Sequence, residues 1–87
     1  MVNGGHKMRR LREGLGLTMR EVQAESRKLA KRFRNSRLII VPARLSVLES
    51  KNVAPNLYRL YVLARIYRRD VRELMTFYGL PRFKAAS

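Results

Sequence analysis

The sequence contains no cysteine and only one histidine, His6, among its 87 residues. Without cysteine the chain can form neither a disulfide framework nor a cysteine-based zinc site, which removes two common ways of holding a small domain together. A single histidine near the amino terminus supplies neither a metal cluster nor a Ser-His-Asp set, and no glycine-rich phosphate loop follows a predicted strand. We therefore expect no enzymatic activity, no metal and no small-molecule cofactor.

Long hydrophobic runs are also missing. The longest purely aliphatic run covers residues 38–41, far short of the roughly 20 residues that a membrane-spanning helix needs. Residues 1–10 have no apolar core of the kind found in secretory signal peptides. We expect a cytoplasmic chain with no membrane partner.

Acidic residues are scarce. The chain has 6 aspartates and glutamates against 20 lysines and arginines, which gives a formal net charge of +14 at pH 7. Its hydrophobic share of 46% is ordinary for a globular protein, so the composition does not predict disorder. So much positive charge in a small body repels itself, and a polyanion relieves the repulsion. The composition indicates nucleic acid as the first partner class, with an anionic membrane surface or an acidic protein second.

Apolar residues at helical spacing predict five helices in one domain, residues 6–79, followed by a short tail, residues 80–87. The first helix covers about residues 6–15 and should end at a left-handed Gly16. Thr18 and Glu21 have the spacing of a capping box and open a lengthened second helix, which should stop at Asn35 and Ser36. The residues expected to face inward are Met8, Leu11 and Leu15 in the first helix and Val22, Ser26, Leu29 and Phe33 in the second.

Residues 38–41 are expected to form an extended linker, because Pro42 holds the residue before it away from helical backbone. Pro42 also suits the first position of a short third helix, about residues 42–50. Its inward residues are Leu45 and Leu48.

Capping residues mark the last two helices. Asn56 should open a fourth helix, and Asp70 with Glu73 should form a second capping box before a fifth helix that ends at Gly79. The inner stripes are expected to be Leu57, Leu60, Ala64 and Tyr67 in the fourth helix and Val71, Leu74 and Tyr78 in the fifth.

Three of these features match one known family. Gly16, Leu17 and Thr18 open a capped helix, a short helix carries Ser46, Leu48 and Glu49, and Pro55, Asn56 and Leu57 open the next helix. Together they resemble the Cro and phage-repressor (XRE-type) helix-turn-helix family over roughly residues 8–79. The resemblance implies an all-α, lambda-repressor-like fold and sequence-specific binding of double-stranded DNA by a homodimeric, nucleoid-associated transcriptional regulator. The recognition helix, about residues 42–50, would then lie in the major groove.

The chain departs from the family pattern by an insertion between the second helix and the recognition helix. Arg27 stands where the family has the glycine of a tight turn, and Met19 stands where a glutamine often follows the capping threonine. Arg68 and Arg69 occupy the place of a Gly-Val turn between the last two helices.

The resemblance also implies which residues contact DNA. Arg44 is the strongest candidate for reading bases, because a guanidinium can bridge O6 and N7 of guanine, whereas Ser46 bonds to several bases and the small apolar side chains touch only a thymine methyl. Direct readout should therefore be modest. The expected DNA-binding set is Ala43, Arg44, Ser46 and Val47 at the bases, Lys51 and Asn52 at the backbone, Thr18 and Met19 at the start of the second helix, and Arg27, Lys31, Arg34 and Arg37 in the insertion.

Other interpretations remain for several of these features. The chain could be a general RNA-binding or nucleoid protein, since it has many cations and few base-reading side chains, or an antitoxin-like interaction module. Glu49 should make an ion pair with nearby Arg44 or Lys51 that positions the third helix. The aromatic residues could stack single-stranded bases, but helical spacing favours a core or dimer role for Tyr58, Tyr61, Tyr67, Phe77 and Tyr78. The apolar carboxy-terminal end predicts a homodimer through Phe77, Tyr78, Leu80 and Phe83.

Overall fold

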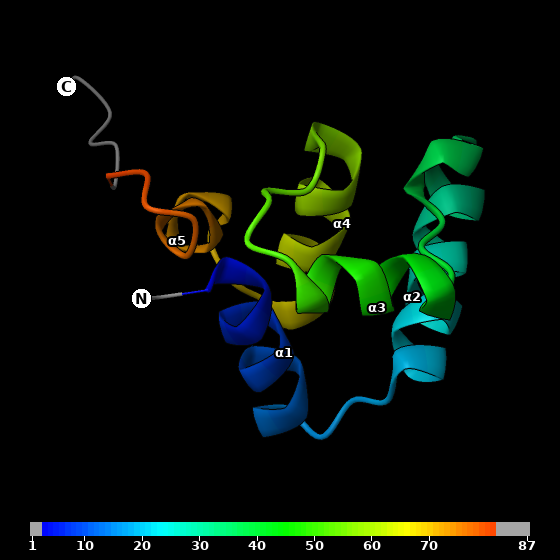
Figure 1. Cartoon of the computed structure of the whole chain (residues 1–87). Helices are drawn as coiled ribbons and strands as arrows, with labels where there is room; N and C mark the ends of the chain where they lie inside the picture. The colour runs from blue at the N-terminus through cyan, green and yellow to red at the C-terminus, as the bar shows by residue number, and fades with distance from the viewer. Residues whose placement is uncertain (1–2, 82–87) are drawn as a thin grey trace, which may run out of the picture.

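The computed structural model describes residues 3–81, which form five α-helices and one turn of 3₁₀-helix (Figure 1). This part of the chain contains no strand, so the expected all-α, five-helix fold is confirmed. The elements are α1 (Gly4–Gly14), α2 (Met19–Phe33), η1 (Ser36–Leu38), α3 (Pro42–Ser50), α4 (Leu57–Tyr67) and α5 (Val71–Thr76).

The helix ends follow the capping residues. The Asn3 side chain accepts from the amides of Gly5 and His6, which is why α1 starts at Gly4 and not at residue 6 as predicted. The Thr18–Glu21 capping box forms as expected, and Gly16 has the predicted positive φ of 73°. Two helices end less usually, because Arg34 and Arg68 take the left-handed conformation in which glycine is the common residue.

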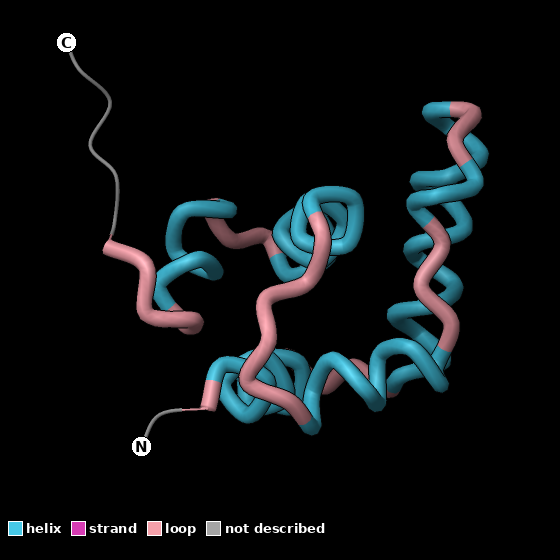
Figure 2. The backbone as a smooth tube through the Cα atoms, turned by 45° about the horizontal axis from the view of Figure 1, so that its top comes forward, coloured by secondary structure: helices cyan, strands magenta, loops and turns pink. Residues whose placement is uncertain are grey.

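The connection between α2 and α3 is only partly extended, which corrects the predicted linker. Residues 36–38 form η1, capped by the Asn35 side chain, so Leu38 is not extended, whereas Ile39 and Val41 are. The amide of Ile40 donates to the Ser26 hydroxyl at 3.0 Å, and Ser26 is fully buried. Figure 2 shows the result, in which the connection runs back along α2 before α3 begins.

The core gathers side chains from η1 and all five α-helices. α4 lies between α2 and α5, and α3 crosses from α2 to α1 in front of it (Figure 1). Three residues predicted to face inward are exposed instead: Leu15, Phe33 and Leu57. Each lies at or next to a helix end, where the facing elements leave much of the side chain uncovered. The most deeply buried side chains include Met8, Val22, Ile40, Leu45, Val62, Leu63, Tyr67 and Leu74.

The fifth helix is shorter than predicted. Some of the apolar side chains at the carboxy-terminal end pack against the rest of the domain. α5 ends at Thr76, and residues 77–79 continue as a turn that closes with a positive φ at Gly79. The Tyr78 ring packs so closely on Gly4 that a side chain on Gly4 would collide with it, and burial raises the pKa of Tyr78 to about 12. Phe77 is also half-buried. Phe83 lies outside the described residues, and Leu80, at 47%, is the exposed large apolar residue that the structure describes at this end.

Ser26 is predicted to be a main determinant of how α3 begins. Ser26→Ala removes the acceptor of the Ile40 amide, so the free energy of unfolding should fall by about 1–3 kcal/mol. Ser36→Ala, at an exposed serine of η1, should change it by less than about 0.5 kcal/mol. Urea denaturation of both variants measures the difference, and equal losses would contradict the role of Ser26.

Candidate nucleic-acid interface

The third helix presents one face to solvent. It begins with Pro42 after an extended Val41, and it packs on both α1 and α2. Leu45 and Glu49 are buried at positions four residues apart, and Leu48 is half-buried beside them. The four residues expected to face DNA bases lie on the opposite, exposed face: Ala43, Arg44, Ser46 and Val47.

A buried ion pair fixes α3 to α1. The Arg12 guanidinium donates to both Glu49 carboxylate oxygens at 2.7 and 3.0 Å, and it also donates to the Leu17 carbonyl at 2.8 Å. Arg12 is only 7% exposed and Glu49 3%. The hydrogen bond to Glu49 raises the pKa of Arg12, so the Arg12 guanidinium stays charged.

This pair corrects the expected partner of Glu49. An ion pair was expected with Arg44 or Lys51, but both cations are exposed and Glu49 turns inward to Arg12. The sequence held a signal that could have indicated Arg12. It follows Met8 by four residues and therefore shares the buried face of α1, whereas Leu15 is exposed.

A second contact fixes the same, carboxy-terminal end of α3. The Asn52 side-chain oxygen accepts from the Gly4 amide at 2.7 Å, so its expected phosphate contact competes with a structural one. The backbone of α1 also approaches the end of α3 closely. A Cβ at Gly5 would lie 2.5 Å from the carbonyl oxygens of Leu48 and Lys51, so only glycine fits there.

Only some of the groups at the start of α2 are available to bind a phosphate. Thr18 is exposed, and its hydroxyl accepts from the Glu21 amide while Glu21 accepts from the Thr18 amide. These hydrogen bonds lower the pKa of Glu21. The amides of Met19 and Arg20 are the remaining donors of the first turn. The Met19 side chain, however, packs against the core.

The exposed side of α2 carries a row of cations. Arg20, Arg27, Lys31 and Arg34 are all exposed, and their spacing of seven, four and three residues places them on one stripe. The row spans roughly 21 Å of helix at 1.5 Å per residue. The acidic residues of α2 lie off this stripe, where Glu25 pairs with Lys28 at 3.2 Å. The predicted cations Arg27, Lys31 and Arg34 thus belong to one surface, and Arg20 is an addition to it.

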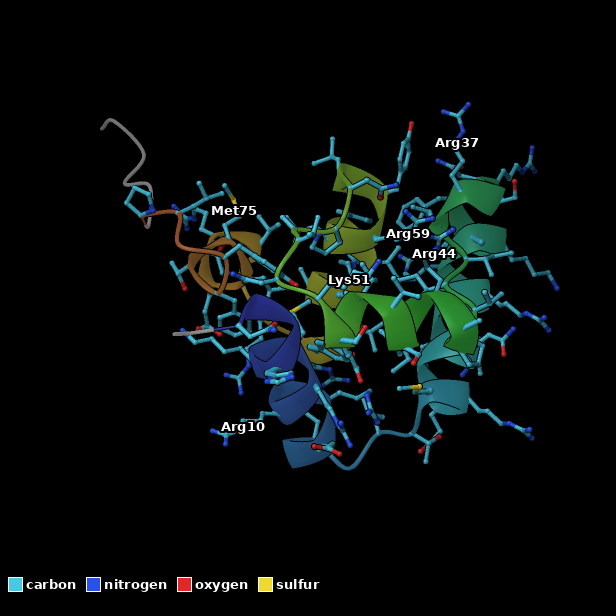
Figure 3. The ribbon with its side chains drawn as sticks, viewed as in Figure 1. Arg10, Arg37, Arg44, Lys51, Arg59 and Met75 are labelled. Atoms are coloured by element: carbon cyan, nitrogen blue, oxygen red, sulfur yellow. The ribbon has the colours of Figure 1, made fainter. Side chains whose placement is uncertain are left out.

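Arg37 lies apart from α3. Its guanidinium sits 5.6 Å from the centre of the Tyr58 ring and donates to the Tyr58 hydroxyl at 3.2 Å. Figure 3 places it at the far end of α2, whereas Arg44, Lys51 and Arg59 gather over α3 and the start of α4. Arg59 was not among the predicted residues. It is half-buried in the first turn of α4, beside buried Leu60, and its charge close to the third helix is the only signal that the sequence offered.

The carboxylates of residues 3–81 are all engaged elsewhere. Five take part in ion pairs, with Arg9, Arg12, Lys28, Arg69 and Arg72, and the sixth, Glu21, is in the capping box. None of them pairs with a cation of the α2 row or of the α3 face. The α2 row and the exposed face of α3 therefore carry cations and no carboxylate of their own.

No protein-family model, curated protein or solved structure matches this chain. Within residues 3–81 there is no helix both long and apolar enough to cross a membrane. The same residues hold no group of three or more His, Asp or Glu side chains placed to bind a metal ion.

The Arg12–Glu49 pair predicts a large asymmetry between single and double substitutions. Glu49→Gln leaves a buried arginine without its counter-ion and should lower the free energy of unfolding by about 3–5 kcal/mol. The double variant Arg12→Met/Glu49→Leu should recover most of this loss. Glu13→Gln, which breaks an exposed pair with Arg9, should cost less than about 1 kcal/mol. Urea denaturation of the three variants tests this, and similar losses at Glu49 and Glu13 would contradict it.

Proposed function

We propose that this protein is a DNA-binding regulator that places α3 in the major groove of double-stranded DNA. The observation that carries the proposal is the cationic surface around α3. The exposed face of α3 holds Arg44, Ser46 and Val47, and the one carboxylate of this helix, Glu49, is buried. The cations of α2 flank this face. The likeness of the sequence to the XRE-type family supports the same function.

The rigid attachment of α3 supports sequence reading over simple charge attraction. Reading a base requires a side chain held in register, and the Arg12–Glu49 pair and the Asn52–Gly4 hydrogen bond hold the carboxy-terminal half of α3. The Ser26–Ile40 hydrogen bond holds the connection just before α3. The α2 row would then meet phosphates beside the groove and set the orientation of the protein on the duplex.

A general nucleic-acid binder is the second candidate. It is favoured by one observation, the small number of base-reading groups on α3 compared with the many unpaired cations around it. Selection of bound sequences from a random duplex pool separates the two functions. Enrichment of a defined site supports a specific regulator, whereas recovery of unenriched sequences supports the general binder and overturns the first proposal.

The charge predicts a steep salt dependence. If six or more cations of this surface meet phosphates, the logarithm of affinity should fall with the logarithm of salt concentration at a slope of about −5 or steeper. Titration of a labelled duplex at several salt concentrations measures the slope. A value near zero would exclude nucleic acid as the main partner.

Arg44 and Lys31 are predicted to have different roles. Arg44→Ala should cost about 1–3 kcal/mol on the preferred site and relax the preference at one base pair. Lys31→Ala should weaken binding to all sequences alike and make the salt slope shallower by about one unit. Arg10→Ala is the matched control, because Arg10 is exposed and points away from this surface (Figure 3). Binding of each protein variant to a panel of duplexes with single-base changes distinguishes the two roles. If Lys31→Ala changes the order of preferred DNA sequences, base reading belongs to α2 instead of α3.

We also propose that two copies act together, since helix-turn-helix domains commonly read paired half-sites about 34 Å apart. The carboxy-terminal end with exposed Leu80 is the proposed contact, although Phe77 and Tyr78 contribute less area than the sequence indicated. Sedimentation of the protein free and on a two-half-site duplex should show a dimer in at least the bound state. Monomers in both states would contradict the proposal.

A further inference from the structure

A groove runs between α2 and α4. Two hollows open along it, one of about 610 Å³ and one of about 410 Å³. The larger is lined by residues that include Leu17, Leu29, Arg32, Arg65, Ile66 and Arg68. The smaller is lined by Phe33, Asn35, Leu38, Leu57, Tyr58 and Tyr61. We call this the α2–α4 groove.

An aromatic pair separates the two hollows. Phe33 and Tyr61 meet edge to face, with ring centres 6.5 Å apart, and their exposed fractions are 45% and 39%. The Arg32 and Arg65 guanidinium groups lie 5.6 and 6.0 Å from the centre of the Phe33 ring, and Arg65 is 5.9 Å from that of Tyr61. The groove therefore has an apolar floor with cations held at its edge.

The groove lies apart from the proposed DNA interface. No residue of α3 lines either hollow in the described part of the chain. On α2, Leu29, Arg32 and Phe33 occupy the side of the helix opposite to Arg27, Lys31 and Arg34. A partner in this groove could be bound while the α3 face holds DNA.

The cations at the edge of the groove have no acidic partner. Arg32, Arg65 and Arg68 make no ion pair within residues 3–81, and the one carboxylate beside them, Glu25, pairs with Lys28. A fitting occupant must supply both apolar side chains and negative charge. A second copy of this chain fits poorly, because its net charge is +14 and its described carboxylates are engaged.

Single-stranded nucleic acid also fits poorly. Stacking needs an open aromatic face, whereas guanidinium groups lie over Phe33, Tyr61 and Tyr58. The groove also presents aliphatic side chains, Leu29 and Ile66 in one hollow and Leu38 and Leu57 in the other. Aliphatic side chains spaced along a helix match such a surface better than bases do.

We propose that the α2–α4 groove binds an acidic amphipathic helix of another protein. Apolar side chains one and two turns apart would enter the two hollows on either side of the Phe33–Tyr61 pair. Carboxylates on the flanks of that helix would meet Arg32, Arg65 and Arg68 in charge-assisted hydrogen bonds. With 11 residues in α4, or roughly 16 Å, the groove accommodates about three turns of helix.

The test uses a synthetic, fluorescein-labelled peptide of about 14 residues, with leucines on one helical face and glutamates elsewhere. Its control has the same composition in an order that scatters the leucines around the helix. Anisotropy is measured with the full chain at about 0.15 M salt, where exposed charges are screened beyond about 8 Å. The protein variants are Phe33→Ala, Arg65→Gln and Arg10→Gln. Arg10 is the matched control, since it is an exposed helical arginine that makes no ion pair within residues 3–81 and lies away from the groove.

We expect the amphipathic peptide to bind at least about tenfold more tightly than its scrambled control. Phe33→Ala and Arg65→Gln should each weaken it by about fivefold or more, and Arg10→Gln by less than about twofold. Equal binding of the two peptides, or equal losses in Arg65→Gln and Arg10→Gln, would overturn the proposal. Because the assay contains no DNA, its failure would leave the DNA-binding proposal unaffected.

Two further measurements exclude the other occupants. If oligo-dT displaces the peptide and itself binds Phe33→Ala more weakly than the unaltered chain, the groove is a nucleic-acid platform and the proposal is wrong. If the free protein sediments as a dimer that Phe33→Ala dissociates, a second copy fills the groove and the proposal is equally wrong. Unchanged oligo-dT binding and unchanged sedimentation of Phe33→Ala support it.

Discussion

The buried ion pair between Arg12 and Glu49 sets the position of α3. The side chains that α3 presents to solvent depend on this pair. Burying two charges costs several kcal/mol per ion, which is recovered only when the geometry is good and the remaining donors are satisfied. Here both carboxylate oxygens are bonded, and the third contact of the guanidinium is the Leu17 carbonyl. The pair gives α3 one orientation, because a rotation of the helix would leave both charges unpaired in the core.

The same pair also affects which charges lie on the surface of the molecule. It removes the only carboxylate of α3 from the surface, so the exposed face of that helix carries Arg44 and no acidic group. Other carboxylates are neutralised by neighbours close in sequence, such as Glu25 by Lys28 and Glu73 by Arg69. Because the few acidic residues are each held by a neighbour or a cap, most lysines and arginines of residues 3–81 have no acidic partner.

The parts of the fold that depend on local sequence could be predicted, and those that depend on distant partners could not. Thr18 and Pro42 act within a few residues of themselves, so the starts of α2 and α3 follow from sequence alone. The buried Arg12 and the bonded Ser26 acquire their roles from Glu49 and Ile40, which are far away in the chain. Leu57 is a case in which local sequence was not enough. It lies on the predicted apolar stripe of α4, but no element covers that end of the helix, and Leu57 is 77% exposed.

Arg34 and Arg68 end their helices in a conformation that costs a residue with a Cβ about 1 kcal/mol or more. Glycine at either position would relieve that cost, and it is the residue that helix ends of this kind usually contain. The two arginines instead lie one on each of the two charged surfaces, Arg34 in the α2 row and Arg68 at the edge of the α2–α4 groove. At both places the domain thus has a positive charge at the expense of thermal stability. Selection for heat resistance alone would favour glycine at these two positions and so remove positive charge from both surfaces.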